Sequence, residues 1–223
     1  MQKLKLKHFL TDKPFSFSRW GDGEWLPVLG YYKTKNADGS DITPTLGYEL
    51  RRVIYNDLNY YHGMLAITFA NCDRKAVNRF LSGNTTTANW YRGDCLLDSM
   101  LAGELKPLIE KIREHKVLYV GPKHLRPLNN DFFEYKHYIE IPNSNSYKQR
   151  KNVLKKIENV IDNVDFIGYS AGMLSNMLID DVFKKYPEIT QIDFGSSFDG
   201  YFGVIKRSYA KQVNWDELLK KNS

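Results

Sequence analysis

Residues 164–199 read VDFIGYSAGMLSNMLIDDVFKKYPEITQIDFGSSFD, and this stretch decides the fold class. Val164 to Tyr169 is a short apolar run that is typical of a buried strand, and a glycine-rich loop follows it. Met173 to Lys185 then carries apolar residues at helical spacing, and a second apolar run begins at Ile189. A strand, a helix and a strand in this order predict two parallel neighbouring strands joined by a crossover helix.

Both strands of this unit end in loops that suit a ligand. Ligands of parallel sheets bind beyond the carboxyl ends of the strands, where these two loops fall. The first loop also opens a helix, whose free amides and dipole favour an anion. We expect a phosphate group to contact Gly168, Ser170, Ala171 and Gly172 in the first loop and Ser196 in the second. The alternative is an ordinary turn in which the glycines serve only packing.

A second motif lies near the N-terminus, where residues 15–25 read FSFSRWGDGEW. Ser16 to Trp20 alternates polar and aromatic residues, which predicts a half-buried strand. The glycines Gly21 and Gly23 predict a sharp turn directly after it. On this turn Asp22 and Glu24 could share one divalent cation, and Arg19 could bind a phosphate. The alternative is a polar hairpin turn without a ligand.

The rest of the chain alternates helices with apolar strands. Helices are expected at 46–59, 73–81, 103–115 and from Lys148 onward, and strands at 63–69, 117–120 and 138–141, with a β-prone segment at 84–92. Residues 33–45 are polar and rich in turn formers, which predicts a surface loop over the site. The alternation predicts an α/β fold: a single domain over residues 1–223 with a largely parallel, Rossmann-like sheet flanked by helices.

The order of these motifs resembles the GT-D-type glycosyltransferases. Besides the two motifs above, Lys116 to Leu125 is similar to the family's central strand and loop, and Ile139 to Tyr147 to its next strand and polar loop. The resemblance covers roughly residues 14 to 209. It implies a GT-D-type fold and an inverting transfer from a nucleoside-diphosphate sugar, with a UDP-sugar expected first. It also implies that Asp22 and Glu24 help to bind Mn²⁺ or Mg²⁺ and the diphosphate.

Further residues have expected roles that follow from their places at strand ends. Asp199 is expected to deprotonate the acceptor, although it could instead cap a helix or pair with Lys206 or Arg207. Asn145 is expected to contact the nucleotide, with helix capping as the alternative. Arg19 and Gly21 are expected beside the diphosphate. His124 follows a strand end, but a lone histidine is more often structural.

Composition limits the classes of protein to consider. The chain has 223 residues, a net charge of +6 and only two cysteines, Cys72 and Cys95, without metal-ligand spacing. No apolar run approaches the roughly 18 residues of a membrane span, and no secretory signal is evident, so a cytoplasmic location is expected (host cytoplasm for a viral protein). The sequence lacks the P-loop, zinc-protease and nucleophile-elbow motifs.

Two classes of function remain open at this point. The first is a metal-dependent glycosyltransferase whose acceptor is a glycan or a hydroxymethylated pyrimidine in viral DNA. The second is a non-catalytic nucleotide-binding or nucleic-acid-binding module, which the positive charge would favour. Paired carboxylates distinguish them, because a transferase that holds a cation needs Asp22 and Glu24 and a polyanion-binding module does not.

Overall fold

The sheet is the central feature of the computed structural model, which describes residues 1–32, 34–54, 60–83, 89–205 and 208–223. The described strands form one eight-stranded sheet in which every neighbouring pair is parallel. In spatial order the strands are β1 (Gln2–Lys3), β4 (Asn89–Arg92), β3 (Tyr60–Met64), β2 (Ser16–Trp20), β8 (Thr190–Asp193), β7 (Phe166–Tyr169), β5 (Val117–Pro122) and β6 (His137–Ile141). The predicted α/β class with a parallel sheet is confirmed.

The two halves of the sheet meet at β2 and β8, which come from distant parts of the sequence. Ser16 and Phe17 of β2 pair with Gln191 and Ile192 of β8. From β2 the chain winds outward through β3 and β4, whereas β5 to β8 build the other half. Such a reversal of winding opens a crevice at the carboxyl ends of the two central strands, where open α/β sheets bind their ligands.

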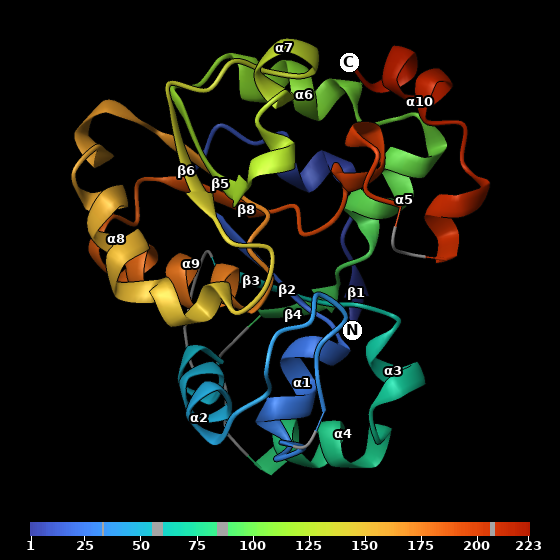
Figure 1. Ribbon diagram of the computed structural model, residues 1–223, viewed down its shortest axis with the longest axis vertical. Coiled ribbons are helices and arrows are strands. Elements are labelled where there is room, and N and C mark those ends of the chain that lie inside the picture. Colours follow the sequence, from blue (N-terminus) through green and yellow to red (C-terminus); the bar gives the residue numbers. More distant parts are fainter. Residues whose placement is uncertain (33, 55–59, 84–88, 206–207) are drawn as a thin grey trace.

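Helices cover both faces of the sheet (Figure 1). The side chains of α5 (Cys95–Ala102), α6 (Lys106–Arg113) and α10 (Trp215–Asn222) belong to the hydrophobic core on one face. The other face is covered by α1 (Asp22–Val28), α2 (Pro44–Val53), α4 (Arg74–Gly83), α8 (Arg150–Glu158) and α9 (Met173–Lys185). Two short helices, α3 (Thr68–Asn71) and α7 (Leu128–Asp131), lie in connections.

Strand β5 shows why the apolar runs fold this way. Val117 and Tyr119 lie in the core on the α5–α6 face, and Leu118 and Val120 in the core on the α8–α9 face. Because successive side chains of a strand point to opposite faces, a strand covered on both sides must be apolar throughout.

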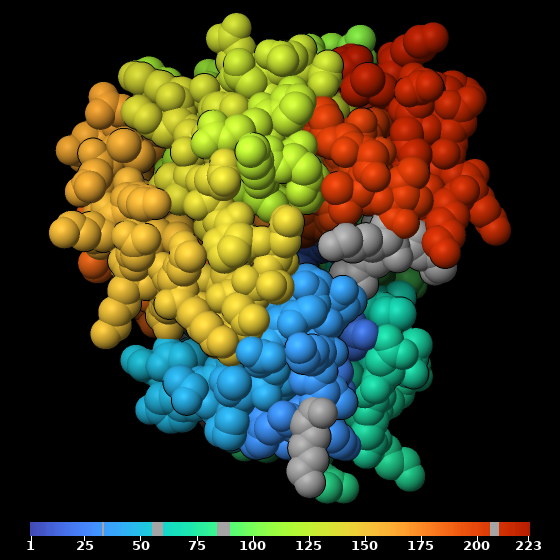
Figure 2. Space-filling view, viewed as in Figure 1, coloured from blue at the N-terminus to red at the C-terminus, as the bar shows by residue number. Residues whose placement is uncertain are grey.

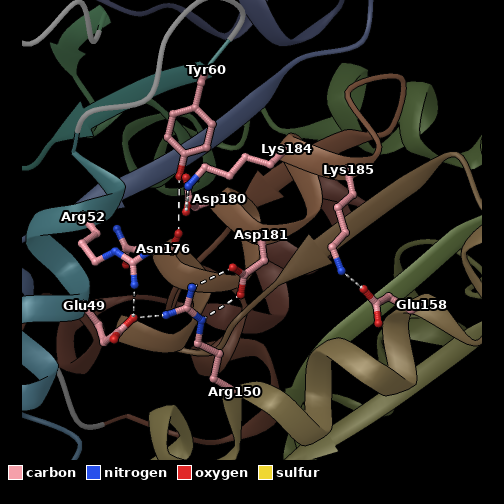
Figure 3. A network of polar contacts seen from close by, with 10 residues as sticks. All are labelled: Glu49, Arg52, Tyr60, Arg150, Glu158, Asn176, Asp180, Asp181, Lys184 and Lys185. Atoms are coloured by element: carbon pink, nitrogen blue, oxygen red, sulfur yellow. Dashed lines mark hydrogen bonds and ion pairs between the residues drawn. The ribbon is translucent and has the colours of Figure 1, made fainter.

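An ion-pair network joins three helices beside the sheet (Figure 3). Arg150 at the start of α8 donates two hydrogen bonds of 2.7 Å to Asp181 of α9 and also binds Glu49 of α2. All three side chains are at least two-thirds buried. A two-pronged guanidinium–carboxylate pair has fixed geometry, so this network fixes α2 and α8 against α9.

Several element bounds differ from the sequence prediction. The strand expected at 63–69 is β3, which ends at Met64 and is followed by α3. The turn expected at Gly21–Glu24 is the first turn of α1. The helix expected at 46–59 begins at Pro44, and α5 was not predicted. Residues 55–59 and 84–88 of the predicted elements lie outside the described residues. By contrast, β2 and α9 have the predicted bounds.

Candidate active site

A cavity of about 440 Å³ lies at the carboxyl ends of the central strands. Its wall is built from the loops that follow β2, β8, β7 and β5, together with part of the 33–45 loop. Of the predicted site residues, it is lined by Arg19, Gly21, Asp22, Glu24, Ser170, Ala171, Gly172, Ser196 and Asp199. The structure therefore brings the N-terminal and C-terminal motifs together in one site.

The two carboxylates of the N-terminal motif lie in the first turn of α1. Gly21 is the N-cap residue, and its amide donates a 2.7 Å hydrogen bond to Oε2 of Glu24. Asp22 accepts hydrogen bonds from the amide of Gly23 at 3.0 Å and from Nδ2 of Asn71 at 2.6 Å. A glutamate three residues after the N-cap is the helix-start signal in the sequence that would have predicted α1 in place of a turn.

Burial raises the pKa values of two carboxyl groups in this site. Desolvation raises the pKa of Glu24 to about 7. The hydrogen bond from the Gly21 amide lowers this pKa, and the charges of Asp193 and Asp22 raise it further. Desolvation also raises the pKa of Asp193 at the end of β8 to about 6, and the nearby Arg19 guanidinium opposes this rise. A buried carboxylate beside other carboxylates favours its neutral form, so a cation bound here would relieve the repulsion.

Arg19 holds the loop after β8. Its Nη1 donates to the carbonyl oxygen of Phe194, and a Cβ on Gly195 would lie 2.2 Å from the same nitrogen. Gly195 also has a φ of +53°, which favours glycine. One nitrogen of the guanidinium is thus hydrogen-bonded to the protein backbone, while the side chain still lines the cavity. Phosphate binding by Arg19 stays a prediction.

The loop after β7 leaves backbone amides without acceptors at the start of α9. The amide of Ser170 donates to Val120 of β5, and that of Ala171 donates to Oγ of Ser175, so neither is free. The amides of Gly172, Met173 and Leu174 have no acceptor among the described residues, as expected for the first turn of a helix. Gly172 lines the cavity with a φ of +57° and a ψ of −140°, a conformation open to glycine alone.

Two predicted nucleotide-binding residues do not line the cavity. Gly168 lies within β7, where a Cβ would come within 2.7 Å of the Tyr119 ring, so this glycine serves packing. Asn145 is the only described residue other than glycine with a positive φ. Its backbone amide donates to Oγ of Ser40 at 2.7 Å, and its Oδ1 accepts from the amide of Asp41 at 3.0 Å.

The two hydrogen bonds of Asn145 show how the 33–45 loop is held over the site. Asn36, Ala37 and Asp38 of this loop line the cavity, and Asn145 anchors the residues that follow them. Figure 2 shows this blue segment directly against the yellow segment around residue 145. The neighbours of Asn145 that do line the cavity are Asn143 and Ser146, which sequence reasoning had placed in the same polar loop.

Asp199 follows β8 and has a partner from another strand end. It begins a short 3₁₀ helix, Asp199–Phe202, and its Oδ1 lies 3.0 Å from Nε2 of His124. Both side chains are about one-quarter exposed and both line the cavity. The alternatives Lys206 and Arg207 lie outside the described residues. The pairing with His124 was missed because the two residues are far apart in sequence.

The lining of the cavity is strongly acidic. Among the described residues it contains six carboxylates, Asp22, Glu24, Asp38, Asp94, Asp193 and Asp199, and one arginine or lysine, Arg19. Within the described part of the chain, no group of three or more histidine, cysteine, aspartate or glutamate side chains is arranged to hold a metal ion. Asp22 and Glu24 nevertheless fit Mg²⁺ or Mn²⁺, because such ions are commonly bound through one or two carboxylates together with phosphate oxygens of the substrate.

Glu24→Gln should make the protein without bound metal more stable at high pH. The folded pKa of about 7 exceeds the reference value of 4.5, so the wild type loses stability as pH rises from 4.5 to 7. Glutamine keeps an oxygen for the Gly21 amide but carries no charge. At pH 8 we expect a gain of about 1–3 kcal/mol in the free energy of unfolding, and at pH 4 a gain near zero.

Urea titrations in the presence of a chelator measure this difference. The control is Glu188→Gln at an exposed glutamate, which should change stability little at either pH. An equal effect of Glu24→Gln at pH 4 and pH 8 would contradict the assignment of a raised pKa.

Comparison with known proteins supports the fold. No protein-family model matches this sequence, and a search of curated proteins found no match. Among solved structures, one described as "the highly conserved domain of unknown function 1792", with "a distinct glycosyltransferase fold", has a TM-score of 0.64 at 15% identity. The match covers 90% of this chain and 81% of that chain.

A second solved structure is described as a new glycosyltransferase from Streptococcus sanguinis with the same domain. Its TM-score is 0.67 at 19% identity, over 90% of this chain and 84% of that chain. At identities this low, the structural likeness shows the arrangement of the elements and does not by itself show the chemistry. This chain therefore has the fold of the domain of unknown function 1792, which is a glycosyltransferase fold.

Proposed function

We propose that this protein is a metal-dependent glycosyltransferase that moves a sugar from a nucleoside-diphosphate sugar to a hydroxyl group. The observation that carries the proposal is the cavity itself, which is lined by the start of α9 and by six carboxylates, with Arg19 as the one arginine or lysine among the described lining residues. An anionic ligand and an acidic wall are compatible when a divalent cation lies between them.

The diphosphate is placed at the start of α9. The free amides at Gly172 and the two following residues point away from the helix, and the dipole of a 13-residue helix adds positive potential there. Arg19 lines the same cavity, and its guanidinium is proposed to bind a second phosphate oxygen. Ser170 also lines the cavity, with its hydroxyl 2.8 Å from that of Tyr119.

Asp22 and Glu24 are the proposed ligands of Mn²⁺ or Mg²⁺. A cation bound there would neutralise negative charge on the departing diphosphate. Asn71 orients Asp22 through its 2.6 Å bond, and the amide of Gly21 orients Glu24. Both carboxylates are therefore held in place by the protein before a ligand arrives, which reduces the ordering that binding requires.

The nucleoside is placed toward Asn143 and Ser146. Both line the cavity beside Ala171, and Oγ of Ser146 donates a 3.0 Å hydrogen bond to the carbonyl oxygen of Ala171. We propose a UDP-sugar as the donor to test first. Asn145 contributes indirectly, by anchoring the 33–45 loop over the same end of the cavity.

The charge of the cavity favours a neutral acceptor over DNA. No lysine lines the cavity as the described residues define it, whereas six carboxylates do. Acidic side chains repel DNA phosphates, which proteins normally contact through lysine and arginine. We therefore propose a glycan or a free sugar as the acceptor. Apolar side chains of Leu65, Ile67, Leu97 and Val204 on the cavity wall suit an acceptor with an apolar face.

Binding and transfer assays test the proposal. Isothermal titration with UDP should show binding in Mn²⁺ or Mg²⁺ and at least tenfold weaker binding in a chelator. Transfer is then measured by mass spectrometry with UDP-hexoses and p-nitrophenyl glycosides, and with plain and hydroxymethylated DNA. The anomeric configuration of the product, read by NMR, tests inversion.

These measurements also separate the alternative functions. A nucleotide-binding module would bind UDP without any transfer, and a DNA-modifying enzyme would add mass to the hydroxymethylated base alone. Binding of UDP with equal affinity in chelator and in Mn²⁺ would refute the metal-dependent part of the proposal.

No described helix has the length and apolar character that crossing a membrane requires.

A further inference from the structure

We propose that His124 accepts the proton of the attacking hydroxyl through Nδ1, and that Asp199 positions its ring. This inference rests on the proposed function and names the proton acceptor of the same site. It revises the expectation from sequence, in which Asp199 itself removed the proton. The pair was assembled by the fold from two strand ends, β5 and β8.

The contact between the two side chains defines which nitrogen carries hydrogen. Nε2 of His124 lies 3.0 Å from Oδ1 of Asp199. An ionised carboxylate can only accept, so Nε2 must carry a hydrogen and donate it. In a neutral imidazole the lone pair then belongs to Nδ1. Among the described residues none forms a hydrogen bond to Nδ1 of His124, which leaves this lone pair to a substrate.

Both side chains are held by buried neighbours. Leu125 directly follows His124 and Phe198 directly precedes Asp199, and both neighbours are fully buried. Phe198 packs against Phe132 and Phe194, with ring centroids 5.0 and 5.1 Å apart. The backbones on either side of the pair are thus fixed by the core, while the polar ends of the pair face the cavity.

The place of the pair suits the acceptor side of the reaction. Asp22 and Glu24 follow β2 and Gly172 follows β7, whereas His124 follows β5 and Asp199 follows β8. All of them line the same cavity. The proposed diphosphate site and the His124–Asp199 pair therefore belong to different loops that line one space.

The step balances as a single displacement. The acceptor oxygen forms a bond to the anomeric carbon while the bond from that carbon to the diphosphate oxygen breaks, and the bonding electrons leave with the diphosphate. The acceptor proton moves to Nδ1 of His124. Asp199 stabilises the resulting imidazolium through the Nε2 hydrogen bond and keeps its own charge. Imidazole is suited to this role because its neutral form has one nitrogen that donates a hydrogen and one that can accept a proton.

His124→Ala is the central experiment, measured with UDP-glucose, Mn²⁺ and a p-nitrophenyl glycoside acceptor. We expect the transfer rate to fall about 100- to 10,000-fold, the usual contribution of a general base. The affinity for UDP with Mn²⁺ should change less than about threefold, because neither residue of the pair belongs to the loops that we propose for the diphosphate and the metal. Added imidazole should raise the transfer rate of the variant at least tenfold, since the truncated side chain leaves space in the cavity.

Asp199 is tested as a positioning residue by its dependence on His124. Asp199→Ala alone should lower kcat about tenfold or more with little change in the KM for UDP-glucose. In a protein that already carries His124→Ala, the same change should have almost no further effect, because the two residues act as a unit. Independent, multiplying effects of the two changes would contradict a role for Asp199 through His124.

A matched control exists elsewhere in the chain. His115 forms a similar pair with Asp165, in which Nδ1 lies 3.2 Å from Oδ1, and neither residue lines the cavity. His115→Ala should leave transfer unchanged. Near-normal transfer by His124→Ala, or a loss that imidazole does not restore, would overturn the inference alone. A wild-type protein that binds UDP with Mn²⁺ but transfers no sugar would overturn the proposed function as well.

Discussion

Asp22→Asn should lower the rate of sugar transfer at least about 100-fold and should remove the Mn²⁺ dependence of UDP binding. Metal stabilisation of a departing diphosphate is worth several kcal/mol, and each 1.36 kcal/mol is a factor of ten in rate. Asparagine keeps the shape of the side chain and an oxygen for the Gly23 amide. Asn71 can rotate its own amide to offer an oxygen in return, so the first turn of α1 should remain intact.

The measurements are transfer kinetics, calorimetry with UDP and thermal unfolding of the same preparations. The matched control is Asp98→Asn, which removes a half-exposed carboxylate that pairs with Lys3 outside the cavity. We expect this control to transfer sugar at the wild-type rate. If Asp22→Asn binds UDP as well as the wild type at every Mn²⁺ concentration, Asp22 does not hold the metal.

The part of the fold that sequence predicted best is the part with the simplest physics. The bounds of β2 and α9 were correct because each has one unbroken periodicity, and the parallel pairing of β7 and β8 follows from the helix between them. Strand β3 was shifted because the apolar run continues from Met64 through Leu65 and Ile67. The chain leaves the sheet there and turns back, with the amide of Thr68 bonded to the carbonyl oxygen of Leu65.

Helix α1 was not predicted because its local sequence indicates a turn. Two glycines and Pro27 within 7 residues indicate a turn, since neither residue type favours a helix interior. Tertiary contacts override that preference: Trp25 is fully buried, with its ring 5.9 Å from that of Trp20 and 5.7 Å from that of Trp90. The consequence for function is direct, because α1 fixes Asp22 and Glu24 as residues of one helical turn.

The candidate site was predictable as a set of strand ends but not as a set of contacts. A parallel sheet brings its carboxyl ends to one edge, so residues after β2, β7 and β8 were expected together. The pairing of His124 with Asp199 depends on which loops approach each other above that edge. The anchoring of the 33–45 loop by Asn145 depends on a left-handed backbone conformation at one residue. Neither contact leaves a periodic signal in the sequence.

Gly195→Ala should be the most damaging small substitution in the site. The φ of +53° disfavours any residue with a Cβ, at a cost of about 1 kcal/mol. The new methyl would also lie 2.2 Å from Nη1 of Arg19, so the guanidinium must leave its place on the Phe194 carbonyl. Displacing a packed, partly buried side chain adds about 1–3 kcal/mol. We expect a total loss of about 2–4 kcal/mol in the free energy of unfolding.

Function should fall together with stability, because Gly195 lies between residues that line the cavity. Asp193 loses the charge of Arg19 that opposes the rise of its pKa, and the loop that leads to Asp199 is displaced. We expect at least tenfold slower transfer at a temperature where the variant is fully folded. Urea unfolding and transfer kinetics on the same samples measure the two effects.

Gly203→Ala is the control that separates backbone conformation from displacement of Arg19. Gly203 has a φ of +78°, but a Cβ there would meet nothing within 4 Å. It should therefore lose only the roughly 1 kcal/mol of the backbone term. In a protein that carries Arg19→Ala, the change at Gly195 should cost about as little as the change at Gly203, because the clashing group is absent. An undiminished cost of Gly195→Ala in that background would show that Arg19 does not set the conformation of this loop.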